Sequence, residues 1–496
     1  MNVLISTIYK NASEGYLVGG SLRNSLLKKV SYDLDIAMPR ELVVKKAKII
    51  AKSLKAACFI LDEDMLTYRI VSKKHSIQVD ISAIMGKDIN EDIKRRDFTV
   101  NAFAYPIAKK PTINILKGGG FTISNIKKPY LIAPKTAFKD LKSKNIKINC
   151  KTAFIDDPLR MLRLFRISAE LGFKISPSAI KKVKENARLI HKSSQERVKD
   201  ELVKLLSYTN SYEILKLMDK ADLLTTLFMD LESQKGCAQC YYGKGGVLEH
   251  TLSTVKGMDY FAKNFASIYP KHKVKIKKYL EEGENFSLLK LAAILHDIEK
   301  PSTARVIGDR LRFFLHEEKG AKKAMHLLIQ LRFSKNNVRL ITKIIKEHLR
   351  PSNLAANETI TDKAMYRFFR DLHPYELPLL ILCWADYASY VSEKDIKRIC
   401  KKLTMPMITV AEGKKYGSFG KTLRHMQFMG ILLNKFFDTK KQILKKPLLD
   451  GSEVMDLLKI PPSNKVGKIL EALKIAEYEG KIKTRTDAKK FIKKLK

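Results

Sequence analysis

Residues 16–37 read YLVGGSLRNSLLKKVSYDLDIA and determine the expected fold at the start of the chain. The apolar run Tyr16–Val18 predicts a strand that ends at two glycines, and Ser21–Lys29 predicts a helix. A second apolar run over Leu34–Ala37 predicts another strand. Strand, glycine turn, helix and strand in this order indicate a small α/β unit.

The pattern changes further along the chain. Ile77–Ile81 alternates like a strand, and Glu41–Leu54 has helical spacing. Residues 106–150 are irregular and include Gly118-Gly119-Gly120, so we expect strands or a hairpin followed by a connector there. From residue 156 onward helical periodicity dominates. We therefore expect an α+β protein, with a small α/β head followed by all-α regions.

The two glycines and the sequence Asp33-Leu34-Asp35 carry the first recognisable chemistry. Gly19 and Gly20 allow backbone N–H groups to approach a triphosphate, and the helix that follows directs its positive end to the same anion. Alternation along a strand places Asp33 and Asp35 on one face, where two hard oxygen ligands suit Mg²⁺. Asp80 could supply a third carboxylate. Taken singly, a glycine pair is usually a turn and Asp-x-Asp a solvated strand face.

The charge of the chain limits its partners. Lys and Arg total 94 against 52 Asp and Glu, a formal net charge of +42 over 496 residues. A Lys-rich genome would exchange Arg for Lys, but it would not leave acidic residues this scarce. The excess is spread along the chain, which favours a long basic surface and a polyanionic partner such as nucleic acid.

Cysteine usage and hydropathy indicate the compartment. Six cysteines do not form a disulfide framework in a chain of this length. A single CxxC, Cys237 and Cys240, is weak evidence for zinc, and ordinary thiols are favoured. No run has transmembrane length, and no signal peptide is evident. We expect a cytoplasmic protein that contacts no membrane.

Residues 95–102 read RRDFTVNA, and together with GGSLR at 19–23 and DLD at 33–35 they resemble the class II CCA-adding enzyme and bacterial poly(A) polymerase family. The resemblance implies that Asp33 and Asp35 are catalytic and hold Mg²⁺. It also implies a set of head residues that bind the nucleotide: Gly19, Gly20, Ser21, Arg23, Arg96, Asp97 and Asn101. Asn24 stands where the family usually has Asp, so a salt bridge or metal contact is expected to be lost.

Residues 156–166 read DDPLRMLRLFR and resemble the next motif of the family, which reads C and A without a nucleic-acid template. Asp157 and Arg160 are three apart, so on a helix they would share a face and pair with the edge of the base. Arg163 and Arg166 are implied nucleotide contacts. Alternatively, Asp157 is an N-cap and Pro158 the first helical residue. Glu196–Leu202 resembles the following motif, for which we expect a structural role.

A second metal site is predicted in the middle of the chain. His250, His296-Asp297 and Asp386 provide imidazole and carboxylate ligands that suit an unspecified divalent metal. Residues 295–301 read LHDIEKP, and with this series they resemble an HD phosphohydrolase domain. His316 and His348 could hold a second ion. Glu299 stands where relatives commonly have Gly, and it would be strained if that backbone required a positive φ.

These observations predict four regions: a nucleotidyltransferase head over residues 1–150, a helical neck over 151–240 that reads the base and binds RNA, an HD domain over 241–400, and a basic helical region over 401–496. The resemblance implies addition of C and/or A to the 3′ end of tRNA, with CTP and ATP as substrates and contact with the acceptor region. Three alternatives stay open: a poly(A) polymerase, an HD phosphohydrolase with an RNA-binding head, and a non-catalytic RNA-binding protein.

The segment between Asp80 and Arg95 bears on which nucleotides are added. Relatives that build the whole CCA end usually have a longer, Arg-rich flexible loop here, and CC-adding relatives have it shortened. We therefore predict that the chain adds CC and leaves the terminal A to another protein. Alternatively, the insertion at 106–137 replaces the loop.

Overall fold

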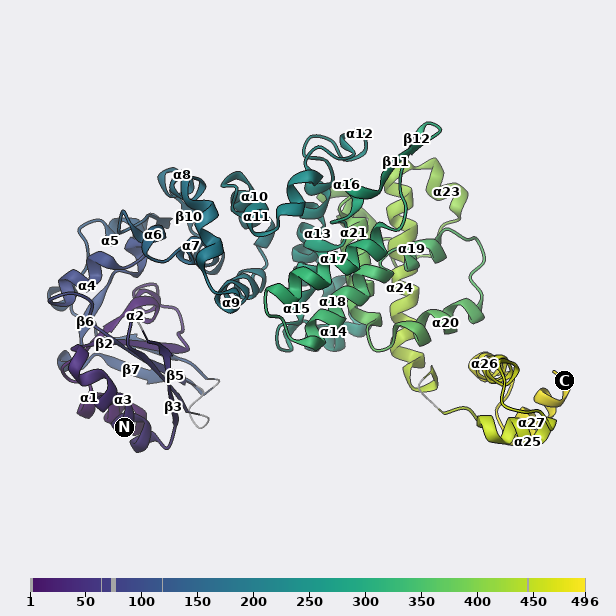
Figure 1. The fold of residues 1–496 in the computed structure, drawn as a ribbon, viewed down its shortest axis with the longest axis horizontal. Coiled ribbons are helices and arrows are strands. Elements are labelled where there is room, and N and C mark those ends of the chain that lie inside the picture. The colour runs from purple at the N-terminus through teal and green to yellow at the C-terminus, as the bar shows by residue number, and fades with distance from the viewer. Residues whose placement is uncertain (1–2, 64, 73–76, 118, 444–445, 496) are drawn as a thin grey trace. The chain divides into compact units, whose positions relative to one another are not determined.

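The computed structural model describes residues 3–63, 65–72, 77–117, 119–443 and 446–495. The chain divides into two compact units (Figure 1). The first contains Met1–Val198 and Leu217–Leu227, and the second contains Lys199–Lys216 and Phe228–Lys496.

A six-stranded sheet forms the centre of the first unit, in the order β3-β4-β5-β2-β1-β6. Its strands are β1 (Tyr16–Val18), β2 (Asp33–Met38), β3 (Ala57–Asp62), β4 (Thr67–Ser72), β5 (Ile77–Ala83) and β6 (Ala104–Pro106). The pair β2 and β5 is parallel, and the other pairs are antiparallel. This order places β2, which carries the Asp-x-Asp sequence, inside the sheet.

Helices cover the sheet and prepare the site. Helices α1 (Val3–Asn11) and α3 (Arg40–Leu54) lie together against one face (Figure 1), where their apolar side chains join those of β2 and β5 in one core. Helix α2 (Gly19–Leu26) links β1 to β2, and α4 (Ile89–Arg95) follows β5. Burial of these apolar stripes supplies the main stabilisation of the unit.

Short elements lead from the sheet to the neck. Strands β7 (Thr112–Ile115) and β8 (Phe121–Ser124) form an antiparallel hairpin. The helices that follow are α5 (Ala137–Lys142), α6 (Ala153–Asp156), α7 (Arg160–Leu171), α8 (Pro177–Asn186), α9 (Gln195–Leu206), α10 (Ser211–Lys220) and α11 (Leu223–Leu227). Helix α7 ends at Gly172, whose φ of +69° is the left-handed conformation that suits glycine at this position.

The second unit is helical. The helices that build its metal-ligand cluster and the cavity beside it are α13 (Gly246–Ile268), α15 (Asn285–Leu295), α17 (His316–Gln330), α18 (Lys335–Glu347), α21 (Glu376–Ala388) and α22 (Glu393–Cys400). Residues 287–295 of α15 are all buried, and Ser287 and Lys290 are the polar residues in this otherwise apolar stretch. A hairpin of β11 (Ala304–Ile307) and β12 (Arg310–Phe313) precedes α17. A separate apolar core joins α25 (Gly451–Leu458), α26 (Asn464–Tyr478) and α27 (Arg485–Lys494).

The α+β architecture predicted from the sequence is confirmed, as are the strands over Tyr16–Val18, Leu34–Ala37 and Ile77–Ile81. Strands β3 and β4 and the β11–β12 hairpin were not expected. Gly118 of the glycine run lies outside the described residues. Among the described residues, no helix is long and apolar enough to cross a membrane.

Candidate active site and metal centre

The carboxylates of β2 lie on one face of the sheet. Leu34 and Ile36 point into the core, so Asp33 and Asp35 both point the other way. The parallel register places Asp80 of β5 directly beside Asp35. Arg69 of β4 donates to both oxygens of Asp80, at 2.8 and 2.7 Å. The third carboxylate is thus held by a guanidinium, and Asp33 and Asp35 are the pair whose donor chemistry suits Mg²⁺.

The ionisation of Asp35 reflects this crowding. Burial and the neighbouring charge of Asp80 raise the pKa of Asp35 to about 6, while Arg96 acts in the opposite direction. A carboxylate in this state is stabilised by any cation that approaches it. The crowded carboxylates on this strand face therefore favour the binding of a cation.

Position 19 requires glycine, because the backbone there approaches Asp35 closely. The φ of Gly19 is +68°, and a Cβ atom there would lie 2.9 Å from Asp35 Oδ2. A Cβ at Gly20 would meet only Arg23 Nη2, at 3.8 Å. Ser21 at the start of α2 donates its hydroxyl proton to the carbonyl oxygen of Val18, at 3.1 Å. The turn therefore places backbone directly beside Asp35, at the positive end of α2.

Arg23 is buried and donates hydrogen bonds to three side chains of the head and neck. Its Nη1 donates to Asn101 Oδ1 at 2.8 Å, and its Nη2 donates to Glu170 Oε1 of α7 at 2.5 Å. The side-chain oxygen of Asn24 accepts from Arg23 Nε at 3.0 Å. The expected loss at Asn24 is thus limited, because the amide still accepts from Arg23 and Glu170 supplies the negative charge.

Asp97 continues the network toward α7. Its Oδ1 accepts from the backbone N of Phe98 at 2.8 Å and from Asn101 at 3.3 Å, and its Oδ2 pairs with Arg163 at 3.1 Å. Burial works to raise the pKa of Asp97, but Arg163, Arg160 and these hydrogen bonds lower it below the usual value. Asp97 is therefore charged, and it anchors the RRDFTVNA segment to α7.

Two other predicted arginines have partners in the same unit. Arg166 pairs with Glu170 Oε2 at 2.9 Å, so one carboxylate serves both Arg166 and Arg23. Arg96 donates to Asp92 of α4 at 3.0 Å. The structure thus brings the head motif and the neck motif into one hydrogen-bonded set.

Asp157 and Arg160 do not share a helix face. Asp157 is extended, with φ −146°, and α7 begins only at Arg160. The Asp157 carboxylate accepts from the backbone N of Leu159 at 3.2 Å and pairs with Arg197 at 2.9 Å. Arg160 donates to the carbonyl oxygen of Arg95 at 3.3 Å. The shared helix face was wrong, because Asp157 is extended and precedes the helix. The capping role is supported, since the Asp157 carboxylate accepts from the backbone N of Leu159, and Pro158 and Leu159 form the turn that leads into α7.

The second unit gathers six buried residues around one point. Their sources are α13, the ends of α15 and α18, the start of α17, and α21, and the residues are His250, His296, Asp297, His316, His348 and Asp386. His250 Nε2 lies 3.1 Å from Asp297 Oδ2 and 3.2 Å from Asp386 Oδ1. His316 Nε2 lies 3.3 Å from Asp297 Oδ1.

The histidines are oriented by their outer nitrogens. The Nδ1 atoms of His296, His316 and His348 face carbonyl oxygens at 2.8, 2.7 and 2.7 Å. His250 Nδ1 faces Ser389 Oγ at 2.9 Å, and that hydroxyl donates to the Asp386 carbonyl at 2.6 Å. With Nδ1 engaged in this way, Nε2 is the nitrogen that each ring directs inward. Burial works to lower the pKa of His250 and His316, but hydrogen bonds to Asp297 raise it above the usual value, so a metal ion would displace a proton from these rings.

The donor set fits metal ions. Ligand atoms of His250, His296 and Asp297 lie within 4.8 Å of one another, and so do those of Asp297, His316 and His348. Both Asp297 oxygens are buried and face nitrogen atoms of the cluster, with His250 Nε2 3.1 Å from Oδ2 and His316 Nε2 3.3 Å from Oδ1. Burial lowers the pKa of His348 to about 3, so it is the neutral ligand form. His250, His296 and Asp297 would hold one divalent ion, and His316 and His348 with Asp297 would suit a second.

Glu299 and Lys300 follow Asp297 in the sequence and lie next to the metal-ligand cluster. Lys300 Nζ lies 2.5 Å from Asp297 Oδ2 and holds that carboxylate in the absence of another cation. Glu299 has φ −100°, so the strain considered for this position does not arise. Its carboxylate pairs with Lys323 at 3.0 Å.

Sequence reasoning missed Arg69, Glu170 and Lys300. The spacing of Arg166 and Glu170 on α7 is an i, i+4 signal that could have suggested that pair. No local signal connects Glu170 to Arg23, which is 147 residues away, or identifies Arg69 as the partner of Asp80.

Three segments of the chain match known family models. Residues 15–122 match the poly A polymerase head domain, 172–235 match the probable RNA and SrmB-binding site of polymerase A, and 247–390 match the HD domain. A CC-adding tRNA nucleotidyltransferase of Thermus thermophilus is 27% identical over 97% of this chain and 93% of its own length. An A-adding tRNA nucleotidyltransferase of Deinococcus radiodurans is 25% identical over 96% and 94%.

A solved structure shares the fold. The Thermotoga maritima CCA-adding enzyme complexed with tRNA superimposes with a TM-score of 0.57 and 17% identity, over 100% of this chain and 94% of that one. The likeness therefore extends over the head, the neck and the helical remainder.

Proposed function

We propose that this chain, which belongs to the family of tRNA nucleotidyltransferases and poly(A) polymerases, adds C and/or A nucleotides to the 3′ end of tRNA. The observation that carries the proposal is the Asp33 and Asp35 pair beside the Gly19 turn, in a chain that is similar over nearly its whole length to CC- and A-adding enzymes.

Each head residue has a separate proposed role in nucleotidyl transfer. Mg²⁺ held by Asp33 and Asp35 would stabilise the attacking 3′-hydroxyl and the leaving pyrophosphate. The backbone at Gly19 and Gly20 donates to the triphosphate at the start of α2. Arg96 would contact the sugar and phosphates, and Arg23 would hold Asn101 and Glu170 in position beside the site.

The neck residues select the base. Arg160 and Arg163 present guanidinium donors from the first turn of α7, and Arg197 fixes the Asp157 carboxylate. A carboxylate accepts from the exocyclic amine of cytosine or adenine, and a guanidinium donates to the adjacent ring nitrogen. Uracil and guanine would leave these groups unpaired, at a cost of about 1–3 kcal/mol for each group.

Addition to a tRNA that lacks its CCA end tests the proposal directly. The wild-type chain should extend it, and Asp33→Asn or Asp35→Asn should lower the rate by about 1,000-fold or more, because each change removes a charged metal ligand. Asp309→Asn, at an exposed turn of the β11–β12 hairpin, is the control and should be as active as wild type. Extension by both head variants at the wild-type rate would contradict the metal assignment.

The product of the same assay identifies the nucleotides. Strand β5 ends at Ala83, and α4 begins at Ile89 with Asp88 as its N-cap, so the segment before Arg95 is short and largely helical. We propose that the chain adds only CC. Reactions with CTP, ATP or both should stop after two C residues. Efficient addition of a terminal A would refute CC-only addition, and long A tails would instead support a poly(A) polymerase.

The four inward Nε2 atoms support a second activity. We propose that the HD centre binds one or two divalent ions and hydrolyses a phosphate ester with a metal-activated water. His316→Ala and His348→Ala should each remove about one bound ion per chain, as measured by elemental analysis. His326→Ala is the matched control, because His326 is exposed on α17, the helix that begins at His316, and it is not one of the clustered ligands. Equal metal content in all variants would contradict the two-ion assignment.

A further inference from the structure

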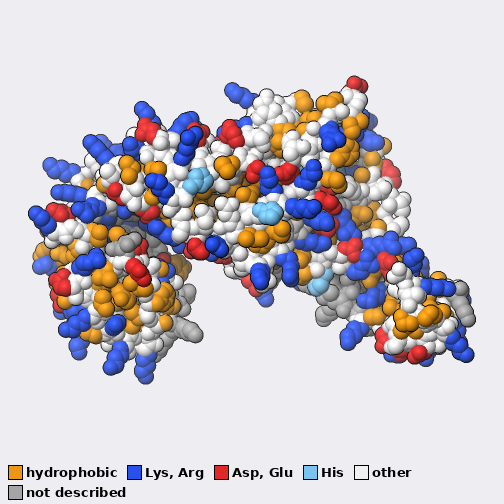
Figure 2. Space-filling view, viewed as in Figure 1, with side chains coloured by type: hydrophobic (Ala, Val, Ile, Leu, Met, Phe, Trp, Pro, Cys, Tyr) orange, Lys and Arg blue, Asp and Glu red, His pale blue; other side chains and the backbone are white. Residues whose placement is uncertain are grey.

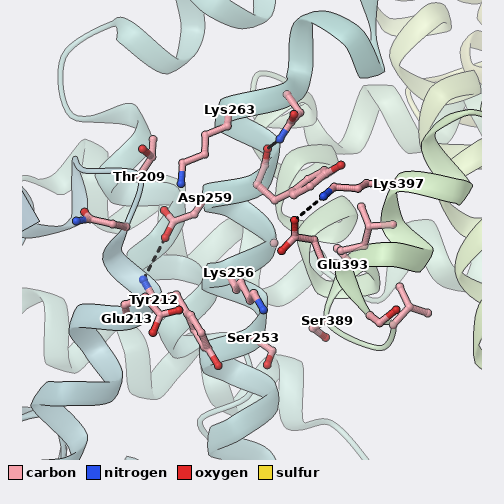
Figure 3. Close-up of a pocket in the computed structure, with 18 residues that line it drawn as sticks. Thr209, Tyr212, Glu213, Ser253, Lys256, Asp259, Lys263, Ser389, Glu393 and Lys397 are labelled. Carbon is pink, nitrogen blue, oxygen red and sulfur yellow. Dashed lines mark hydrogen bonds and ion pairs between the residues drawn. The ribbon is translucent and has the colours of Figure 1, made fainter. Parts of the chain in front are cut away.

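A polar cavity of about 490 Å³ lies in the second unit, beside the HD centre. Figure 3 shows it enclosed by Tyr212 and Glu213 near the start of α10 on one side, and by Glu393 and Lys397 of α22 on the other. One face of α13 lies between them and contributes Lys256 among its residues. Its volume is within the range of cavities that hold small-molecule ligands.

Two of the carboxylates that line the cavity are paired with lysines, whereas two lining lysines have no paired carboxylate in the part of the chain that the structure describes. Asp259 is buried, pairs with buried Lys290 at 2.5 Å, and accepts from the backbone N of Tyr212 at 3.1 Å. Glu393 pairs with Lys397 at 3.0 Å. Across the described residues, Lys256 and Lys263 have no carboxylate within ion-pair distance.

Lys256 and Lys263 determine the net charge of the cavity. They are exposed and lie seven residues apart, so they occupy the same face of α13 two turns from each other. Glu213 is the one lining carboxylate not held by a lysine among the described residues. The rim therefore keeps an excess of positive charge that favours an anion.

The inner wall offers groups for the rest of a ligand. Ser253, Ser389 and Asn264 supply hydroxyl and amide groups. Tyr260 contributes an aromatic ring that stacks on Trp384, with a centroid separation of 6.2 Å. Anionic, hydrogen-bonding and aromatic recognition together match a phosphorylated nucleoside better than a simple inorganic ion.

Ser389 connects the cavity to the HD centre. It lines the cavity, and its Oγ lies 2.9 Å from His250 Nδ1. We propose that this cavity binds a small nucleotide, such as a nucleoside monophosphate, and that its occupancy changes the metal affinity of the HD centre through Ser389. The site is separate from Asp33 and Asp35, so it does not depend on the nucleotidyl-transfer function.

Fluorescence of Trp384, the single tryptophan of the chain, reports on the occupancy of the cavity. In metal-free full-length protein, AMP or CMP should give a saturable change that adenosine, which has no phosphate, gives only weakly. Lys256→Gln with Lys263→Gln should weaken nucleotide affinity by about tenfold or more. Lys278→Gln, an exposed lysine of α14 (Lys273–Glu281) outside the cavity, should leave the affinity unchanged.

Two outcomes would overturn the binding site: no saturable change with either nucleotide at millimolar concentration, or equal affinity in the double variant and wild type. The link through Ser389 is tested by titrating Mn²⁺ alone into a chain that also carries Asp33→Asn and Asp35→Asn. Saturating AMP should shift Mn²⁺ affinity at least threefold, and Ser389→Ala should remove the shift. A shift of the same size in Ser389→Ala would refute the link, because chelation by free AMP acts on both proteins alike.

Discussion

At the scale of single residues, Gly19 sets how closely the turn after β1 approaches Asp35, one of the two carboxylates proposed to hold Mg²⁺. In Gly19→Ala, the new Cβ would lie 2.9 Å from Asp35 Oδ2, in a backbone conformation with φ +68° that Ala adopts poorly. We expect nucleotide addition to fall by about 100-fold, because a small displacement of a reacting group can cost that much. Steady-state kinetics with CTP measure the loss.

Gly20→Ala is the matched control for this prediction. A Cβ at Gly20 would meet only Arg23 Nη2, at 3.8 Å, and the backbone there does not have a positive φ. Its activity should fall much less. Similar losses in the two variants would mean that Gly19 has no special role beside Asp35.

Residue-level predictability depended on how far apart the partners lie in the sequence. Asp33 and Asp35 could be placed on one face because strand alternation is a local rule. The Arg69 and Asp80 pair requires knowledge that β4 and β5 are neighbours in a given register. The sequence therefore indicated the three carboxylates, but it did not indicate that the Arg69 guanidinium pairs with Asp80.

At the scale of elements, α7 is the support of the head site. Glu170 near its end holds Arg23 at 2.5 Å and Arg166 at 2.9 Å. Glu170→Ala would leave the buried Arg23 without its carboxylate, so we expect the free energy of unfolding of the first unit to fall by about 3 kcal/mol. Nucleotide addition should also decrease. Urea unfolding and CTP kinetics measure the two effects.

Glu170→Gln separates charge from hydrogen bonding, because its amide oxygen can still accept from Arg23. It should recover part of the stability lost in Glu170→Ala. Glu185→Ala on α8 removes an exposed carboxylate paired with Lys182 and should behave as wild type. A Glu170→Ala protein as stable as Glu185→Ala would show that the ion pair does not support the head.

Element prediction failed where burial was low or a turn intervened. In β3, Phe59, Ile60 and Leu61 are 48%, 41% and 48% exposed, so this edge strand has no alternation between buried and exposed positions. Asp157 caps the turn at Pro158 and Leu159 as its composition predicts, but the regular helix begins only at Arg160, so the expected helix face shared by Asp157 and Arg160 does not form. The long helices and the carboxylate-bearing strand were predictable because one face of each is consistently buried.

At the scale of the whole molecule, the positive charge distinguishes a nucleic-acid partner from a bias of composition. Figure 2 shows Lys and Arg side chains over the visible face of every part of the chain, and the net charge is +42. If these residues contact tRNA phosphates, affinity for tRNA should fall about 100-fold or more between 50 and 200 mM KCl, because counterions are released on binding. Affinity for CTP involves few charged contacts and should change far less. Filter binding and equilibrium dialysis measure the two, and equal salt dependence would favour the compositional explanation.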